Sequence, residues 1–328
     1  MRTINIFISI LTIISLFGFV PEGFSQDYPT KAIRLIVPYA AGGGTDVLAR
    51  TLQNPLGKEL GTNIIVENIS SGATKVGTLE LLKARPDGYT LLLVGPEVYV
   101  GYYYSGTYEF KPWERLTFIG NTGEEPYGFV EIRTDGPYQT WAELVKYAKQ
   151  NPGKVTGGGP GAGGMVNLIF NEITKDAGID ARYIPFDGSG PAKNALLGGH
   201  IDFRCCMPSE AIIMIRAGKT KGIAVSSPER FMDLKDVPTF KELGIGKSLE
   251  NPMITKAIFG PPNLPQNRVD KIAKALEKVV NGPNFAQYGQ KFLYQPKFKD
   301  GKQTKEETIK FDAIFGPKFE ALYKKLRK

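Results

Sequence analysis

The stretch V-P-Y-A-A-G-G-G-T-D, residues Val37 to Asp46, guides the interpretation of the whole chain. An apolar strand candidate (Ile33–Val37) precedes it, and a helix candidate (Val47–Leu60) follows it. Three consecutive glycines allow positive φ and close approach of a ligand, and Thr45 and Asp46 are expected to cap the helix. Because first-turn N–H groups lack intrahelical partners, this pattern predicts an anion site. The alternative is a plain tight turn between strand and helix.

Length and composition indicate a folded protein with room for two domains. The chain has 328 residues, 42% of them hydrophobic, and a net charge of +8. Lys and Arg are scattered except in the tail Lys318–Lys328, so no nucleic-acid-binding stripe is predicted. The single histidine, His200, argues against a His-rich metal site. The adjacent Cys205 and Cys206 cannot join distant segments, and we expect buried thiols on a strand, with a vicinal disulfide as the alternative.

The N-terminus has the pattern of an export signal. Arg2 precedes the apolar run Ile4–Val20, and the small residues Gly23 and Ser25 predict cleavage before Gln26. We therefore expect a signal peptide over residues 1–25 and a free periplasmic protein without stable membrane insertion.

Strands and helices alternate along the mature chain. Strand-like segments at 32–37, 63–67 and 89–94 are separated by helical segments at 47–60 and 76–84, a βαβαβ pattern that predicts an α/β fold. We expect two lobes, each a mainly parallel sheet with flanking helices, with a ligand cleft between them. Residues 26–124 and 229–328 are predicted to form lobe 1, and residues 125–228 lobe 2. The aromatic stretch Tyr99–Tyr108 is expected to be irregular, and a helix over Thr304–Arg327 to be interrupted near Gly316-Pro317.

A second glycine-rich stretch, G-G-G-P-G-A-G-G-M, spans Gly157–Met165 and precedes another helix candidate. It contains G-x-G-x-x-G, but a dinucleotide fingerprint would need to follow a core strand, so nucleotide binding is kept only as an alternative. The loops Ser70–Thr74 and Asp187–Gly190 have a similar build. In open α/β sheets such loops meet at one crevice, which predicts several N–H-rich loops around a single carboxylate site.

Four side chains near these loops are further candidates. Lys75 could supply a cation, Glu97 could accept a hydrogen bond from an amine or hydroxyl, and Tyr39 and Phe186 could form apolar walls; a solvated lysine, an exposed carboxylate and core packing are the respective alternatives. No serine nucleophile elbow, P-loop or metal-ligand spacing is present. We therefore predict a binding protein without catalytic residues, metal or cofactor.

The chain resembles the extracytoplasmic solute-binding proteins of tripartite tricarboxylate transporters, also called the Bug family. The stretch I-R-L-I-V-P-Y-A-A-G-G-G-T-D is similar to the family's P-F-x-x-G-G-x-x-D pattern. Other family-like motifs cover nearly the whole mature chain: V-E-N (Val66–Asn68), P-D-G-Y-T-L-L-L (Pro86–Leu93), N-P-G-K (Asn151–Lys154), P-F-D-G-S-G-P (Pro185–Pro191), L-L-G-G-H-I-D (Leu196–Asp202), A-V-S-S-P-E-R (Ala224–Arg230) and V-P-T-F-K-E-L-G (Val237–Gly244).

The resemblance implies a two-lobed, type II-like periplasmic-binding-protein fold that closes over a small carboxylate and then docks on a membrane permease. In the family, loops matching Tyr39–Asp46 and Gly157–Met165 hold a ligand carboxylate, partly through ordered water. Together with the candidates above, the predicted ligand-binding residues are Tyr39, Ala40, Gly43, Gly44, Thr45, Asp46, Lys75, Glu97, Gly161, Ala162, Gly163, Met165, Phe186, Asp187, Ser189 and Cys206.

This chain departs from the family pattern at S-G-A-T-K-V-G (Ser71–Gly77), in the glycine loop before Met165, and at Cys206. The all-glycine loop is expected to make the second lobe roomier and less polar, which favours an aromatic or branched carboxylate over citrate. A monomer is expected. The alternative functions are a sensory binding protein for a receptor kinase and an exported nucleotide-using enzyme.

Overall fold

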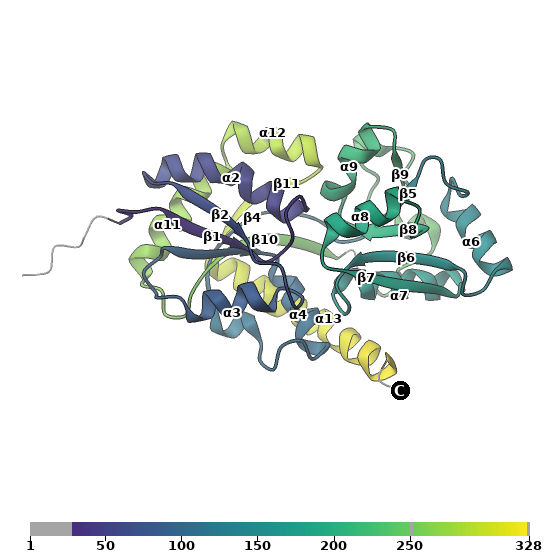
Figure 1. Ribbon diagram of the computed structural model, residues 1–328, viewed down its shortest axis with the longest axis horizontal. Helices are drawn as coiled ribbons and strands as arrows, with labels where there is room; N and C mark the ends of the chain where they lie inside the picture. The colour runs from purple at the N-terminus through teal and green to yellow at the C-terminus, as the bar shows by residue number, and fades with distance from the viewer. Residues whose placement is uncertain (1–27, 250–251, 327–328) are drawn as a thin grey trace, which may run out of the picture.

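The computed structural model describes residues 28–249 and 252–326 and has two lobes, each a β-sheet with helices around it (Figure 1). The two-lobed α/β architecture predicted from the sequence is confirmed. The predicted signal peptide and its cleavage site lie outside the described residues. Within the part of the chain that is described, no helix combines the length and apolar character that crossing a membrane requires.

The first lobe begins with the predicted βαβαβ unit. Strands β1 (Ile33–Val37), β2 (Ile64–Asn68) and β3 (Thr90–Val94) pair in parallel with β1 in the middle. Helices α2 (Gly44–Leu60) and α3 (Lys75–Lys83) make the crossovers. Since parallel strands end at the same sheet edge, the loops after β1 and β3 open on one side of the lobe.

Three strands that join through antiparallel pairing complete this sheet, so it is mixed and the prediction of a mainly parallel sheet is corrected. They are β4 (Thr117–Pro126), β10 (Met253–Gly260) and β11 (Gln295–Asp300), in the order β11-β4-β10-β3-β1-β2. β4 leads the chain out to the second lobe and β10 brings it back. The two strands therefore run in opposite directions where they pair.

The second lobe is built on a five-stranded sheet of order β7-β6-β8-β5-β9. This sheet is also mixed, because β6 pairs in parallel with β7 and β8 whereas β5 is antiparallel to β8 and β9. Its strands are β5 (Phe129–Arg133), β6 (Val155–Pro160), β7 (Ala181–Phe186), β8 (Phe203–Cys206) and β9 (Thr220–Val225). Its helices are α6 (Trp141–Gln150), α7 (Met165–Ala177), α8 (Ser189–Leu197) and α9 (Pro208–Arg216).

The segment after β9 remains on the second lobe. It contains a 3-10 helix, η2 (Met232–Leu234), and the short helix α10 (Phe240–Leu243). Thr239 forms a bridge with Val225, and the Ser248 hydroxyl donates to Glu172 of α7 at 2.6 Å. We propose that the second lobe spans about residues 127 to 249, so that the return crossing lies after the expected boundary at residue 228.

The remaining helices belong to the first lobe: α4 (Pro96–Tyr104), α5 (Pro112–Arg115), α11 (Gln266–Val280), α12 (Pro283–Phe292) and α13 (Gly301–Leu326). Helix α4 occupies the stretch expected to be irregular. All residues from Pro96 to Tyr102 are buried, so the helix has no polar face and shows no amphipathic period. Helix α13 continues through Gly316-Pro317, where an interruption was expected, and Gly316 packs against the Tyr104 side chain of α4.

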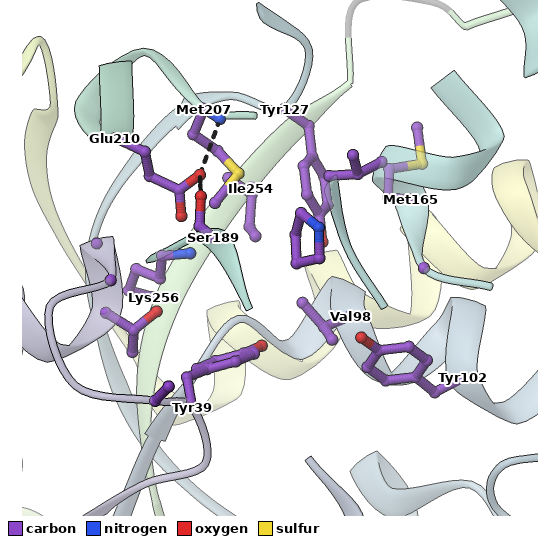
Figure 2. Close-up of a pocket in the computed structure, with 17 residues that line it drawn as sticks. Tyr39, Val98, Tyr102, Tyr127, Met165, Ser189, Met207, Glu210, Ile254 and Lys256 are labelled. Atoms are coloured by element: carbon purple, nitrogen blue, oxygen red, sulfur yellow. Dashed lines mark hydrogen bonds between the residues drawn. The ribbon is translucent and has the colours of Figure 1, made fainter. Parts of the chain in front are cut away.

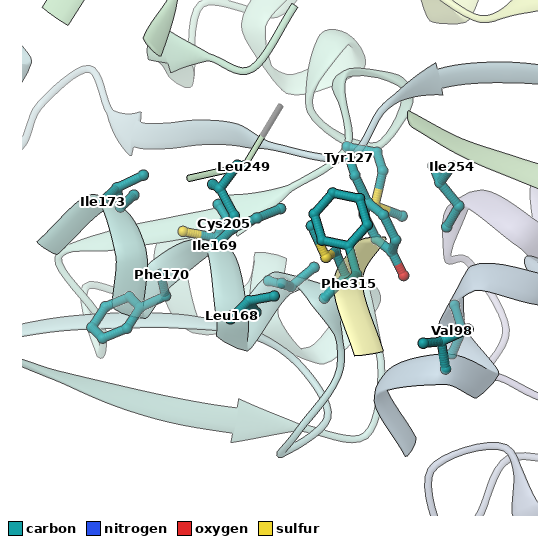
Figure 3. Packing of buried hydrophobic residues seen from close by; sticks show 14 of the residues in the cluster. Val98, Tyr127, Leu168, Ile169, Phe170, Ile173, Cys205, Leu249, Ile254 and Phe315 are labelled. Atoms are coloured by element: carbon teal, nitrogen blue, oxygen red, sulfur yellow. The ribbon is translucent and has the colours of Figure 1, made fainter. Parts of the chain in front are cut away.

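One hydrophobic cluster runs through both lobes (Figure 3). It joins Val98 and Ile254 of the first lobe to Ile169 of the second, with Tyr127 at the crossing between them. A second cluster lies between the first sheet and helices α2 and α11. Because Val98, Tyr127 and Ile254 also line the cavity between the lobes, the floor of that cavity is part of the core.

Candidate functional site

A narrow cavity lies between the lobes (Figure 2). The first lobe contributes the β1–α2 loop, helix α4 and strand β10, and the second lobe contributes the starts of α7, α8 and α9. The lining residues are Tyr39, Ala40, Gly43, Gly44, Thr45, Val98, Tyr102, Tyr127, Pro160, Gly164, Met165, Val166, Ser189, Met207, Glu210, Ile254 and Lys256. The two glycine-rich loops identified in the sequence therefore share one cavity.

The N-terminus of helix α2 borders the cavity, and no described side chain caps its first-turn amides. Its N-cap is Gly43, which makes no side-chain hydrogen bond to the helix. The expected capping by Thr45 and Asp46 is wrong, because the helix begins at Gly44 and places both residues in its first turn. The amides at the start of this turn remain available to an anion, and the helix dipole favours negative charge there.

Asp46 shapes the loop instead of facing the cavity. Its carboxylate accepts hydrogen bonds from the Gly42 amide (2.9 Å), Arg50 Nε (3.1 Å) and Asn68 Nδ2 (3.0 Å). Burial acts to raise the Asp46 pKa, but the hydrogen bonds from Arg50, Gly42 and Asn68 outweigh it and hold the pKa below its usual value. Asp46 is thus a support of the α2 start.

The N-terminus of helix α7 borders the same cavity from the second lobe. Its N-cap, Gly164, also makes no side-chain hydrogen bond, and Gly164, Met165 and Val166 line the cavity. The α2 and α7 ends therefore offer amide donors from opposite lobes.

The glycines before α7 fill a different role from the one expected. Gly157 to Gly159 lie within strand β6, where a Cβ on Gly157 would come within 2.6 Å of both Phe203 and Phe170. A Cβ on Gly161 would lie 2.3 Å from the Tyr102 hydroxyl. Aromatic rings occupy the space that these glycines leave, so the expectation of a roomier second lobe is wrong.

The charged side chains of the cavity are Lys256 of β10 and Glu210 of α9, and the sequence analysis identified neither. Lys256 is only 4% exposed. Glu210 Oε2 accepts hydrogen bonds from the Ser189 hydroxyl at 2.5 Å and from the Met207 amide at 3.3 Å (Figure 2). Lys256 could have been suspected, because it is the one charged residue in the apolar strand Met253–Gly260.

A buried ion pair supports Ser189. Arg204 Nε donates to Glu131 Oε2 at 2.7 Å, and Arg204 Nη1 donates to the Ser189 carbonyl and hydroxyl at 3.1 Å each. Cys206, a predicted ligand residue, is fully buried with its sulfur 3.8 Å from Glu131 Oε2. Cys205 and Cys206 are both free thiols on β8, as expected.

Two buried carboxylates lie on the first-lobe side of Lys256. Glu97 accepts hydrogen bonds from the Thr255 amide and hydroxyl at 3.2 and 2.9 Å. It therefore binds strand β10 and does not line the cavity. Glu125 accepts from the Ser209 amide and hydroxyl at 3.1 and 2.9 Å and so joins β4 to α9. Burial raises the pKa of both carboxyls to about 7, although the nearby Lys256 charge acts to lower them.

Three tyrosines complete the walls. Tyr39, Tyr102 and Tyr127 all line the cavity, and Val98 and Met165 lie among them (Figure 2). Burial raises the pKa of each of these tyrosines above its ordinary value, so the hydroxyls are neutral hydrogen-bonding groups. Sequence analysis missed Tyr102 because it treated α4 as irregular.

The sixteen predicted ligand residues separate into three groups. Tyr39, Ala40, Gly43, Gly44, Thr45, Met165 and Ser189 line the cavity. Lys75, Gly161, Ala162, Phe186 and Asp187 line an outer hollow that shares Tyr39, Tyr102 and Pro160 with the cavity. Asp46, Glu97, Gly163 and Cys206 line neither. Among the described residues, no cluster of three or more His, Cys, Asp or Glu side chains could hold a metal ion.

Comparison with known proteins places this architecture in a family. Residues 48–313 match the model of the tripartite tricarboxylate transporter family receptor, TctC. A protein encoded in the gbd 5' region of Cupriavidus necator is 33% identical over 290 residues, which cover 87% of this chain and 86% of that protein.

Solved structures agree with the family match. The periplasmic binding protein BugD has a TM-score of 0.81 and 28% identity, with 91% of this chain and 98% of BugD covered. MatC from Rhodopseudomonas palustris, solved with bound malate, shares the fold with a TM-score of 0.80 at 22% identity, covering 89% of this chain and 100% of MatC. The chain therefore belongs to the tripartite tricarboxylate transporter receptor (TctC) family of periplasmic solute-binding proteins.

Proposed function

We propose that this protein captures a small organic carboxylate in the interlobe cavity and delivers it to a membrane permease of the tripartite tricarboxylate type. One observation carries the proposal. Two helices from opposite lobes begin at glycine N-caps on the same cavity, and the buried Lys256 also lines that cavity. Helix-start amides and a cation together favour an anionic guest.

The walls support a ligand with an apolar body. Tyr39, Tyr102, Tyr127, Val98 and Met165 offer aromatic and aliphatic surface with few charges. This apolar surface suits an aromatic or branched carboxylate. It offers few groups that could compensate the three charges of citrate. MatC, which shares the fold, holds malate, so a carboxylate guest is compatible with this architecture.

Native mass spectrometry of the purified protein, followed by isothermal titration against mono-, di- and tricarboxylates, tests capture. We expect a monomer that retains a small acid, and an aromatic or branched carboxylate as the tightest binder in the panel. Citrate as the tightest binder would contradict the proposed apolar body. Binding of no carboxylate, or turnover of a nucleotide, would contradict the proposed function itself.

Delivery needs a separate test in cells. Family membership supports a permease partner. A strain that lacks this protein should lose uptake of the identified acid, and a plasmid copy should restore it. Unchanged uptake, with loss of a transcriptional response to the acid, would favour a sensory role instead.

A further inference from the structure

Lys256 is a buried cation that makes no ion pair or hydrogen bond with the residues that the structure describes. Its side chain rises from β10 and points towards Ser189 inside the cavity (Figure 2). Among the described residues, its ammonium has no carboxylate within 4.0 Å and no hydrogen bond, and the residue is 4% exposed. The carboxylates of Glu97 and Glu125 are committed to Thr255 and Ser209. A desolvated ammonium in this situation is costly unless a ligand supplies the negative charge.

Glu210 has one carboxylate oxygen fixed and the other open. Oε2 accepts from Ser189 and Met207, as described above. Oε1 accepts no hydrogen bond within the described part of the chain. It lies beside the start of α2, where a Cβ on Gly44 would be 3.3 Å from it. This oxygen is therefore placed to accept a hydrogen bond from a guest at the helix end.

Lys256 and Glu210 line the same end of the cavity but do not form an ion pair within 4.0 Å of each other. The other end is formed by Tyr102, Tyr127 and Met165 (Figure 2). The cavity thus has a charged end and an aromatic end. A guest that lies along it would place its head group between the lysine and the glutamate.

We propose that Lys256 and Glu210 together select acids in which a hydrogen-bond donor, an ammonium or a hydroxyl, is attached to the carbon next to the carboxylate. Lys256 and the α2 amides bind the carboxylate, and Glu210 Oε1 accepts from the donor. The remainder of the ligand extends towards the tyrosines. This inference rests on the proposed carboxylate-binding function and adds the head group that the site selects.

Isothermal titration with two matched series tests the inference: succinate, malate and aspartate, and 3-phenylpropanoate, 3-phenyllactate and phenylalanine. In the better-bound series, the 2-hydroxy or 2-amino acid should bind at least about tenfold more tightly than its parent. Glu210→Gln should weaken an amino acid by about tenfold or more and a hydroxy acid by about threefold, and should leave the parent within about twofold, because only the ammonium requires a charged acceptor. Lys256→Met should weaken every member by about 30-fold, because all share the carboxylate.

Two controls separate binding from folding. Lys193→Met removes a lysine from the neighbouring hollow on α8 and should change each dissociation constant by less than about twofold. Circular dichroism melting should show Lys256→Met and Glu210→Gln folded at the titration temperature; if Lys256→Met fails to fold, Lys256→Gln takes its place.

The outcomes are distinguishable. Equal binding of parent and substituted acids, or equal weakening of all of them by Glu210→Gln, would overturn the head-group inference while leaving the proposed function intact. If the folded wild-type protein binds none of the six acids and no other carboxylate, the proposed function fails and the inference falls with it.

Discussion

The starts of α2 and α7 look alike in sequence and are built differently. Both helices follow a glycine-rich run and both have a glycine N-cap on the interlobe cavity. The α2 start is held by polar contacts from Asp46 to Gly42, Arg50 and Asn68. The α7 start is held by rings, because Tyr102 of α4 and Tyr323 of α13 pack directly on Gly161 and Gly163.

This difference shows that a glycine run before a helix has two physical origins. At Gly42, positive φ is needed but no atom would lie within 4 Å of an added Cβ, so the glycine serves the turn. At Gly163, φ is +100° and an added Cβ would lie 2.2 Å from the Tyr323 hydroxyl, so the glycine also makes room for a side chain of the other lobe. The glycine at position 42 therefore serves the backbone alone, whereas the glycine at position 163 also serves packing between the lobes.

Breaking the buried support of the second lobe should have the largest effect. Glu131 and Arg204 are at most 1% exposed, and the pair positions Ser189. Glu131→Gln leaves the Arg204 charge uncompensated and should lower the free energy of unfolding by about 3–5 kcal/mol, measured by urea denaturation. The double variant Glu131→Gln/Arg204→Met removes both charges and should recover much of the loss. A loss below about 1 kcal/mol in the single variant would contradict this account.

Alanine substitutions compare the two glycine runs directly. Gly163→Ala combines a left-handed backbone with a clash against Tyr323 and should lower the free energy of unfolding by about 3 kcal/mol. Gly42→Ala has only the backbone penalty and should cost about 1 kcal/mol. Tyr323→Phe in the Gly163→Ala background removes the clashing hydroxyl and should restore part of the difference. Equal costs at both glycines would show that ring packing does not distinguish the loops.

Glu125, near the crossing between the two lobes, should make the free energy of unfolding depend on pH. Burial raises its pKa from 4.5 to about 7, so between these values the folded protein holds a proton that the unfolded chain releases. This contribution to stability is complete below about pH 4.5 and is lost as the pH rises through about 7, a change of roughly 3 kcal/mol. Glu125→Gln should flatten that part of the curve of unfolding free energy against pH. A slope that is unchanged in the variant would assign the effect to another group.

Sequence analysis found the parts of the site that local patterns encode. The strand, glycine turn and helix at residues 33–60 are contiguous, so the α2 anion site could be inferred from spacing alone. The second glycine run was also found, but its use was misjudged. Phe203 and Phe170, which fill the space beside Gly157, are distant in the chain, and no local pattern links them to that glycine.

The missed residues depend on tertiary structure. Lys256 reaches the cavity only because β10 returns from the second lobe and inserts between β3 and β4. Tyr102 lies on a helix that is buried all round, which removes the polar face that would reveal its period. The antiparallel pairing was missed for the same reason, since pairing of β4 with β10 joins segments more than a hundred residues apart.

The smallest expected effect concerns the start of α2, which polar contacts from Asp46 hold in place. Asp46→Asn keeps the shape of the side chain but turns an amide towards the donors of Gly42, Arg50 and Asn68, so we expect a loss of about 1 kcal/mol in the free energy of unfolding near pH 7. Because the Asp46 pKa is held below its ordinary value, its contribution is present above that value and is lost as the pH falls through the lowered pKa. The wild type and the variant should therefore converge in urea denaturation as the pH falls below the ordinary range of an aspartate. Arg50→Met removes one half-exposed partner and serves as the milder control. A constant difference between wild type and variant at every pH would show that Asp46 supports the α2 start by its shape and not by its charge.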